Sequence, residues 1–210
     1  MVTLFLLASW LLFTDADIGP TSRTFSAIFV HGMVDELRGA PSASALEPSA
    51  HFDEAGIAFD YPAVLRRRDE VDDDGSRTYS LEYGMFTIEL HAPTHGVDSA
   101  LYLGAIVDVF EGGTRIDAEG PMPGRGALLC GEQRTATRIR LKMMGDWSEM
   151  EGFDLPSPDA HPRLLVFDDE TLGQGNTPLA LAAYERVFAT LRCAGTRLPG
   201  AADAGDAVEQ

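Results

Sequence analysis

Positive charge and cysteine are both scarce in this chain. Sixteen lysines and arginines stand against 33 aspartates and glutamates, which gives a formal net charge of −17. Nucleic acids and anionic membranes are bound through basic patches that release counterions, so the composition argues against both as partners. The presence of only two cysteines excludes a disulfide-dense small domain and any zinc cluster made of cysteines alone.

The sequence signatures of several enzyme classes are also missing. The chain contains no GxSxG nucleophile motif, no GxxxxGK phosphate loop, no GxGxxG dinucleotide motif and no CxxC pair. We therefore expect no cofactor, and a function in binding is favoured over one in catalysis.

The chain has one long apolar run, Val2 to Phe13. Twelve helical residues rise about 18 Å, which is too short for a hydrocarbon core of about 30 Å. The length is typical of a secretory signal, so we predict a signal peptide over residues 1–16 and export to the periplasm or the extracellular space. No membrane-spanning segment is then expected in the mature chain. An alternative start at Met33 would give a cytoplasmic protein.

Composition divides the remaining chain into three parts. Residues 17–50 end in a small, Ser- and Pro-rich stretch and predict a disordered tether. Residues 198–210 predict an acidic disordered tail. The overall content of 45% hydrophobic residues with 11 phenylalanines excludes wholesale disorder, so a single folded domain is expected over 51–197.

Periodicity in this domain predicts strands and two helices. Alternation of apolar and polar residues indicates strands over 56–62, 78–83, 85–90, 127–130 and 134–143, and a continuous apolar run indicates a central strand over 163–168. The turn at Asp72–Gly75 is expected to join the first two strands as a hairpin.

The two helices have recognisable ends. The first begins at Asp98 or Ser99 and ends at Gly112-Gly113. The second has Thr177 as its cap and Pro178 in its first turn. Its expected buried side is made of Leu181, Tyr184, Phe188 and Leu191. The order strands, helix, strands, helix predicts an α+β fold with an antiparallel sheet flanked by helices.

A strand ending in Phe59-x-Tyr61-Pro62, a helix ahead of a long inter-strand region, and a closing amphipathic helix over 178–193 together resemble the PsbP-like domain family. The similarity covers about residues 52–195. It implies an α/β/α sandwich and a non-catalytic binding or assembly module of an exported protein.

Two short segments carry candidate metal ligands. His91, His95 and Asp98 lie within eight residues, and imidazole with carboxylate suits zinc or a similar ion. The competing interpretation is a polar loop in which Asp98 caps the following helix. The segment Glu70–Ser76 resembles the start of a calcium loop, but Leu81 stands where that loop needs its bidentate acid, which favours a solvated hairpin turn.

A basic stripe and an aromatic loop are the candidate binding surfaces. Alternate positions of the strand over 134–143 predict one basic face, made of Arg134, Arg138, Arg140 and Lys142. Such a stripe could accept an acidic partner, or it could pair across strands with acids such as Glu82 and Glu89. The segment 145–152 is expected to be a turn whose Trp147 covers the edge of the core, with a ligand-gripping loop as the alternative.

The two cysteines, Cys130 and Cys193, each end a predicted element. In an exported protein they could form a disulfide across a 63-residue loop, and in a reducing compartment they would be ordinary buried thiols. Spacing alone leaves both alternatives open.

The sequence thus favours a binding module whose partner is a protein or a small polar ligand. The predicted contact surface is the open face of the sheet or the Gly- and Pro-rich region over 112–126. The alternative from another class is a small metal-dependent hydrolase that uses His91, His95 and an acid from Asp168 or Asp169.

Overall fold

The computed structural model describes residues 41–84, 86–113, 117–143, 146–158, 161–169 and 177–194. The predicted signal peptide, the alternative start at Met33 and the acidic tail lie outside these residues. Most of the predicted tether does so too, but its last part, from residue 41, is described and contains the short helix α3 (Ala43–Leu46) and the start of β1 (Ser49–Glu54).

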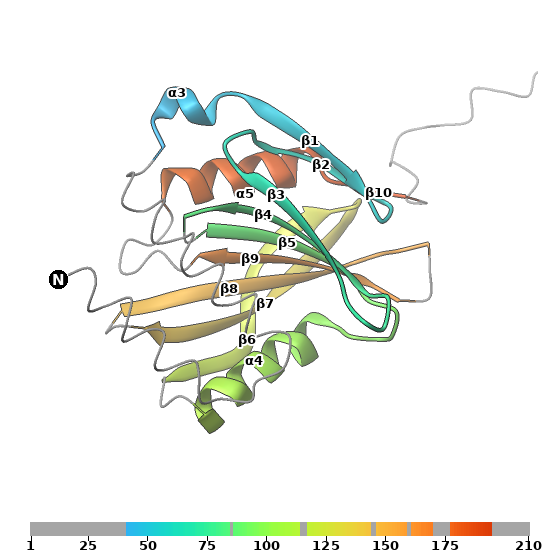
Figure 1. The fold of residues 1–210 in the computed structure, drawn as a ribbon, viewed down its shortest axis with the longest axis vertical. Helices are drawn as coiled ribbons and strands as arrows, with labels where there is room; N and C mark the ends of the chain where they lie inside the picture. The colour runs from blue at the N-terminus through green and yellow to red at the C-terminus, as the bar shows by residue number, and fades with distance from the viewer. Residues whose placement is uncertain are drawn as a thin grey trace, which may run out of the picture.

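Two antiparallel sheets form the body of the described protein (Figure 1). The small sheet has the order β1-β2-β10, with β2 at Ile57–Pro62 and β10 at Arg192–Cys193. The large sheet has seven strands in the order β3-β4-β5-β9-β8-β7-β6. Its strands are β3 (Arg66–Val71), β4 (Arg77–Tyr83), β5 (Phe86–Ala92), β6 (Ala118–Leu129), β7 (Glu132–Met143), β8 (Asp146–Leu155) and β9 (Arg163–Asp169).

The expected α/β/α sandwich, an antiparallel sheet flanked by helices on both faces, is wrong. Strands dominate the described residues. One face of the large sheet packs against the small sheet together with α5 (Pro178–Thr190), and α4 (Ser99–Gly113) lies on the opposite face (Figure 1). The protein is therefore a β-rich fold in which a second sheet takes much of the space that the prediction gave to helices.

The sequence analysis misses the strands β3 and β8, and it finds only the last residues of β6, because these segments lack apolar alternation. The strand β3 reads RRRDEV and lies at an edge, where charge protects the exposed backbone from pairing with other chains. The other edge strand, β6, is rich in Gly and Pro and has two register shifts against β7, which protect that edge in a second way. The strand β8 occupies the segment predicted as a turn over 145–152.

The predicted first hairpin is also wrong in its pairing. Strand β2 pairs with β1 and β10 in the small sheet, while β3 and β4 form the hairpin around the acidic turn. The turn itself is confirmed, with the Gly75 backbone N–H donating to the Asp72 carbonyl at 2.9 Å.

The helix ends and the central strand match their sequence signals. The Thr177 hydroxyl caps α5 by accepting from the backbone N–H of Ala180 at 3.2 Å, and Asp98 accepts from that of Leu101 at 2.8 Å at the start of α4. The strand β9 lies at the centre of the large sheet, and five of its seven residues are buried. On α5, however, Leu181 is 51% exposed, and the buried side is Leu179, Ala180, Ala183, Tyr184 and Val187.

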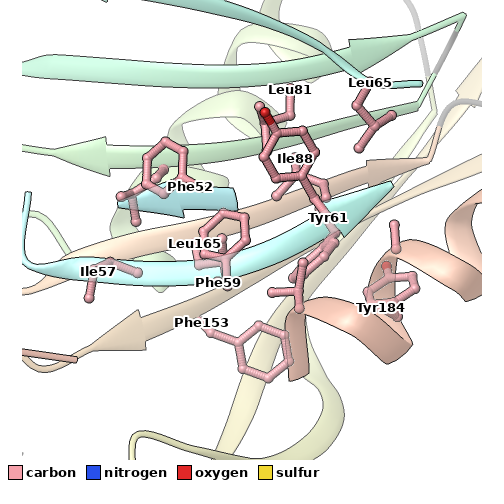
Figure 2. Close-up of a cluster of buried hydrophobic side chains, with 14 of the residues drawn as sticks. Phe52, Ile57, Phe59, Tyr61, Leu65, Leu81, Ile88, Phe153, Leu165 and Tyr184 are labelled. Atoms are coloured by element: carbon pink, nitrogen blue, oxygen red, sulfur yellow. The ribbon is translucent and has the colours of Figure 1, made fainter. Parts of the chain in front are cut away.

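The core has two parts, one on each face of the large sheet. The larger part joins the small sheet and α5 to the large sheet, and Figure 2 shows Phe52, Phe59 and Tyr61 of the small sheet facing Leu81, Ile88 and Leu165 of the large one. The smaller part lies under α4 and joins Leu103, Val107 and Phe110 to Ile139, Leu141, Met150, Leu164 and Val166. Among the described residues, no helix is long and apolar enough to cross a membrane.

Candidate functional site

The first candidate site is the part of the large sheet that extends beyond α5. On the sheet face that packs against α5, the residues of β7 and β8 nearest to the helix are apolar, such as Ala136 and Phe153. Further along the same two strands, the residues on this face are charged or aromatic. We call this uncovered part the open face. It consists of Glu119, Met122, Arg138, Arg140, Lys142, Trp147 and Glu149.

The open face brings together three features that are separate in the sequence. The Gly- and Pro-rich region becomes β6, the basic stripe lies on β7, and Trp147 lies on β8 directly opposite Lys142. The guanidinium of Arg140 lies over the Trp147 ring, 4.7 Å from its centroid, in a cation–π contact. Trp147 is therefore part of the sheet surface. The sequence analysis places it at the edge of the core instead, and that expectation is wrong.

The acids that pair with the basic stripe differ from those expected. Glu82 and Glu89 lie on β4 and β5, away from β7. Instead, Arg140 lies 3.2 Å from a carboxylate oxygen of Glu119 and 3.4 Å from one of Glu149. The other pairs in the stripe are Arg134 with Glu132 and Lys142 with Asp117. Most of the positive charge of the stripe is thus balanced within the molecule.

Arg138 is the exception within the stripe. Its nearest carboxylate oxygen, on Glu149, is 3.8 Å away, which is beyond hydrogen-bonding distance. Its Nη2 donates only to the Met122 thioether sulfur at 3.4 Å, which is a weak acceptor. Its buried Nε has no hydrogen-bond partner, which is also true of the buried Nε atoms of Arg134 and Arg140. The side chain is 33% exposed, so unused donors of a guanidinium reach the surface here.

A saturated charge network closes the open face on the side of α5. The buried carboxylate of Glu151 accepts from the backbone N–H of Arg125 at 3.0 Å and from the Nε of the same residue. The Arg125 guanidinium in turn lies 3.7 Å from the ring centroid of Tyr184. Gly124 permits this approach of β6, since a Cβ there would lie 2.9 Å from a Glu151 oxygen. The Nε of Arg125 therefore has a carboxylate acceptor, in contrast to the Nε of Arg138.

The second candidate site is a pocket of about 160 Å³ at the other end of the large sheet. We call it the hairpin pocket. It unites the two segments that the sequence analysis considered as metal sites, because the acidic turn and the loop after β5 line the same space. Its lining residues are Asp72, Asp74, Ser76, Arg77, Thr78, His91, Pro93, His95, Val97, Tyr102 and Leu164.

A hydrogen-bonded chain of three side chains opens into the hairpin pocket. The His91 Nε2 lies 3.0 Å from a carboxylate oxygen of Glu89, and its Nδ1 lies 3.0 Å from the hydroxyl of Thr78. The Tyr102 ring packs on the imidazole at a centroid distance of 4.6 Å. Burial acts to raise the pKa of the Glu89 carboxyl, but the hydrogen bond and charge of His91 hold that pKa below its usual range.

The predicted metal ligands do not converge. Both ring nitrogens of His91 are engaged, His95 lies 3.3 Å from an Asp74 oxygen, and Asp98 serves as the helix cap. Across the described residues, no group of three His, Cys, Asp or Glu side chains could hold an ion. Asp168 and Asp169 lie on β9 opposite Thr87 and Phe86, and alternate strand residues point to opposite faces, so the two acids do not act on one site.

Cys130 and Cys193 are joined by a disulfide in the structure, with their Cα atoms 5.4 Å apart. Cys130 lies in the turn between β6 and β7, and Cys193 lies in β10 of the small sheet. The bond therefore ties the small sheet to the large one.

Comparison with known proteins finds distant structural likeness and no match in sequence. No family model and no curated protein matches the sequence. A crystal structure from Bacteroides thetaiotaomicron VPI-5482 is similar over 68% of this chain and 47% of that chain, with 13% sequence identity and a TM-score of 0.34. This chain thus spans about half the length of that protein. A likeness at this level carries no argument about function.

Proposed function

We propose that the protein is a binding module whose open face takes up an acidic segment of a partner protein. The observation that carries the proposal is Arg138, a guanidinium with unused donors at the surface of a chain whose net charge is −17. A carboxylate is the natural acceptor for such a group, because it can accept two parallel N–H bonds.

The spacing on β7 supports an extended peptide as the ligand. Arg138 and Arg140 are alternate residues of one strand and point to the same face, about 7 Å apart. Alternate side chains of an extended peptide have the same spacing. Two acids in an i, i+2 arrangement would thus meet the two guanidinium groups, and the Trp147 ring beneath Arg140 supplies an apolar surface beside them.

The proposal includes export of the protein and its assignment as a PsbP-like domain, which both remain predictions. The disulfide supports export, because such bonds persist in oxidising compartments. The metal-dependent hydrolase is less favoured, because the described His and Asp side chains do not assemble a ligand set.

Reversing both charges tests the proposal. The probe is a capped peptide of six residues in which Glu alternates with Ser, titrated into the full chain by calorimetry at low ionic strength. We expect the double variant Arg138→Glu, Arg140→Glu to lose at least about 10-fold in affinity, because two favourable pairs become repulsive. Binding to the parent protein should also weaken as salt is added.

A matched control distinguishes the effect of the open face on affinity from the effect of the protein's net charge. Arg77 and Arg192 are exposed residues outside the open face, and the double variant Arg77→Glu, Arg192→Glu lowers the net charge by as much as the test variant does. Unchanged affinity of the Arg138, Arg140 variant, or an equal loss in the Arg77, Arg192 variant, would contradict the proposal.

A further inference from the structure

The proton positions in the Glu89–His91–Thr78 chain follow from its chemistry. The lowered pKa of Glu89 keeps this side chain ionised, and an ionised carboxylate can only accept hydrogen bonds. The Nε2 of His91 must therefore carry the proton that it donates to Glu89. In the neutral imidazole the Nδ1 is then an acceptor, so the Thr78 hydroxyl donates to it.

Acid, imidazole and hydroxyl in this order form the arrangement that activates a hydroxyl nucleophile. The carboxylate orients the ring, and the neutral form of the ring holds an unprotonated nitrogen against the hydroxyl proton. The strands fix the geometry, since Thr78 and His91 are directly opposite each other on β4 and β5, and Glu89 lies two residues along on the same face. The packing of Tyr102 on His91 restrains the ring from a third side.

This hydroxyl lines a space that can hold a small substrate. The pocket volume of about 160 Å³ is similar to that of cavities that bind benzene, about 150 Å³. Asp72 and Asp74 also line the pocket, and the Ser76 backbone N–H and hydroxyl hold the pKa of Asp74 below its usual value. Asp72 and Asp74 outnumber Arg77, the arginine in the same lining, and this excess of negative charge disfavours anionic ligands and admits neutral or cationic ones.

We propose that the hairpin pocket is an acyl-transfer site that hydrolyses short-chain neutral or cationic esters, with Thr78 as nucleophile and His91 as general base. The Thr78 oxygen bonds to the ester carbonyl carbon while its proton passes to the Nδ1 of His91. The ester C–O bond then breaks, and the departing alcohol oxygen takes that proton. A water molecule attacks the acyl-threonine, its proton returns through His91 to the Thr78 oxygen, and the carboxylic acid leaves.

Within this proposal, the phenol of Tyr102 is the donor to the developing oxyanion. Its side chain lines the pocket beside His91. Burial, followed by the negative charge of nearby carboxylates, with Glu89 first among them, raises the pKa of this phenol well above its usual value. The hydroxyl thus stays protonated and available as a hydrogen-bond donor.

The test uses p-nitrophenyl acetate and the full chain with its disulfide intact. We expect Thr78→Val and His91→Gln each to lower the catalysed rate at least about 100-fold, which is the usual contribution of a positioned base. Thr78→Ser should retain activity within about 10-fold, because it keeps the hydroxyl. Glu89→Gln, a positioning change, should lower kcat and leave KM unchanged. Mass spectrometry of the acid-quenched reaction should find one acetyl group at position 78.

The controls separate this activity from the chemistry of exposed imidazoles and from a general change in surface charge. His51→Gln removes an exposed histidine on β1, and Arg192→Glu reverses an exposed charge on β10; neither should change the rate. If circular dichroism shows that Thr78→Val is unfolded, the hydrolysis rate of Thr78→Ser and the position of the acetyl group test the proposal in its place. Hydrolysis no faster than in buffer, a Thr78→Val rate equal to that of the parent, or acetyl groups at other positions only would overturn the proposal.

Discussion

Replacing Phe167 by alanine is expected to destabilise the protein by about 3–5 kcal/mol. Phe167 is fully buried on β9, the central strand of the large sheet. Its ring stacks on Tyr184 of α5 at a centroid distance of 4.4 Å and meets Phe153 and Phe188 edge-on. The substitution removes both the buried area and these ring contacts, and it leaves a cavity between the sheet and α5. Urea denaturation of parent and variant measures the difference.

An exposed residue of comparable size provides the control. Leu128 on β6 is 66% exposed, so Leu128→Ala should change the free energy of unfolding by no more than about 0.5 kcal/mol. A loss below about 1 kcal/mol for Phe167→Ala would show that α5 does not cover this face of the large sheet.

Reduction of the disulfide is expected to lower stability by about 4 kcal/mol. The bond closes a loop over a sequence separation of 63 residues, and loop-closure entropy gives a value of this size. The bond also secures β10, whose ladder with β2 is only two residues long. Without it, the small sheet is held to the large one by side-chain packing and by α5. Urea denaturation with and without dithiothreitol measures the effect.

The double variant Cys130→Ala, Cys193→Ala is the matched control. It should unfold near the midpoint of the reduced parent, and its midpoint should not respond to dithiothreitol. A parent protein whose intact mass does not rise by two hydrogens on reduction, or whose midpoint is unchanged, would contradict the disulfide.

Helices and strands with a clear periodic pattern of apolar residues could be predicted. Strands whose residues protect an edge of the sheet could not, because they lack that pattern. The helices α4 and α5 and the strands β2, β4, β5, β7 and β9 alternate or repeat as buried elements should, and each lies within a few residues of its predicted position. The edge strands lack that signal, because β3 is charged and β6 is rich in Gly and Pro to protect the sheet. The second sheet is missed because β1 has no recognised signal and β2 is paired with the wrong strand, and the predicted fold class is wrong as a result.

The candidate sites, too, could be predicted only where a residue pattern within one strand reveals them. The basic face of β7 follows from strand periodicity alone, but its acid partners could not be predicted, because they belong to β6 and to the unrecognised strand β8. His91 is a candidate metal ligand in the sequence analysis, and Glu89 is a candidate partner of the basic stripe, but neither Glu89 nor Thr78 is recognised there as a partner of His91. The available signal was the alternation of β5, which places Glu89 and His91 on one face.

The Arg138 Nε–H resonance of the ¹⁵N-labelled protein tests the account of the open face most directly. This group has no acceptor in the structure, whereas the corresponding group of Arg125 donates to Glu151. Adding the alternating Glu peptide should shift the Arg138 resonance in a saturable manner and leave that of Arg125 in place. Two results would contradict the account. In the first, the peptide binds but the Arg138 resonance does not move. In the second, only arginines outside the open face shift.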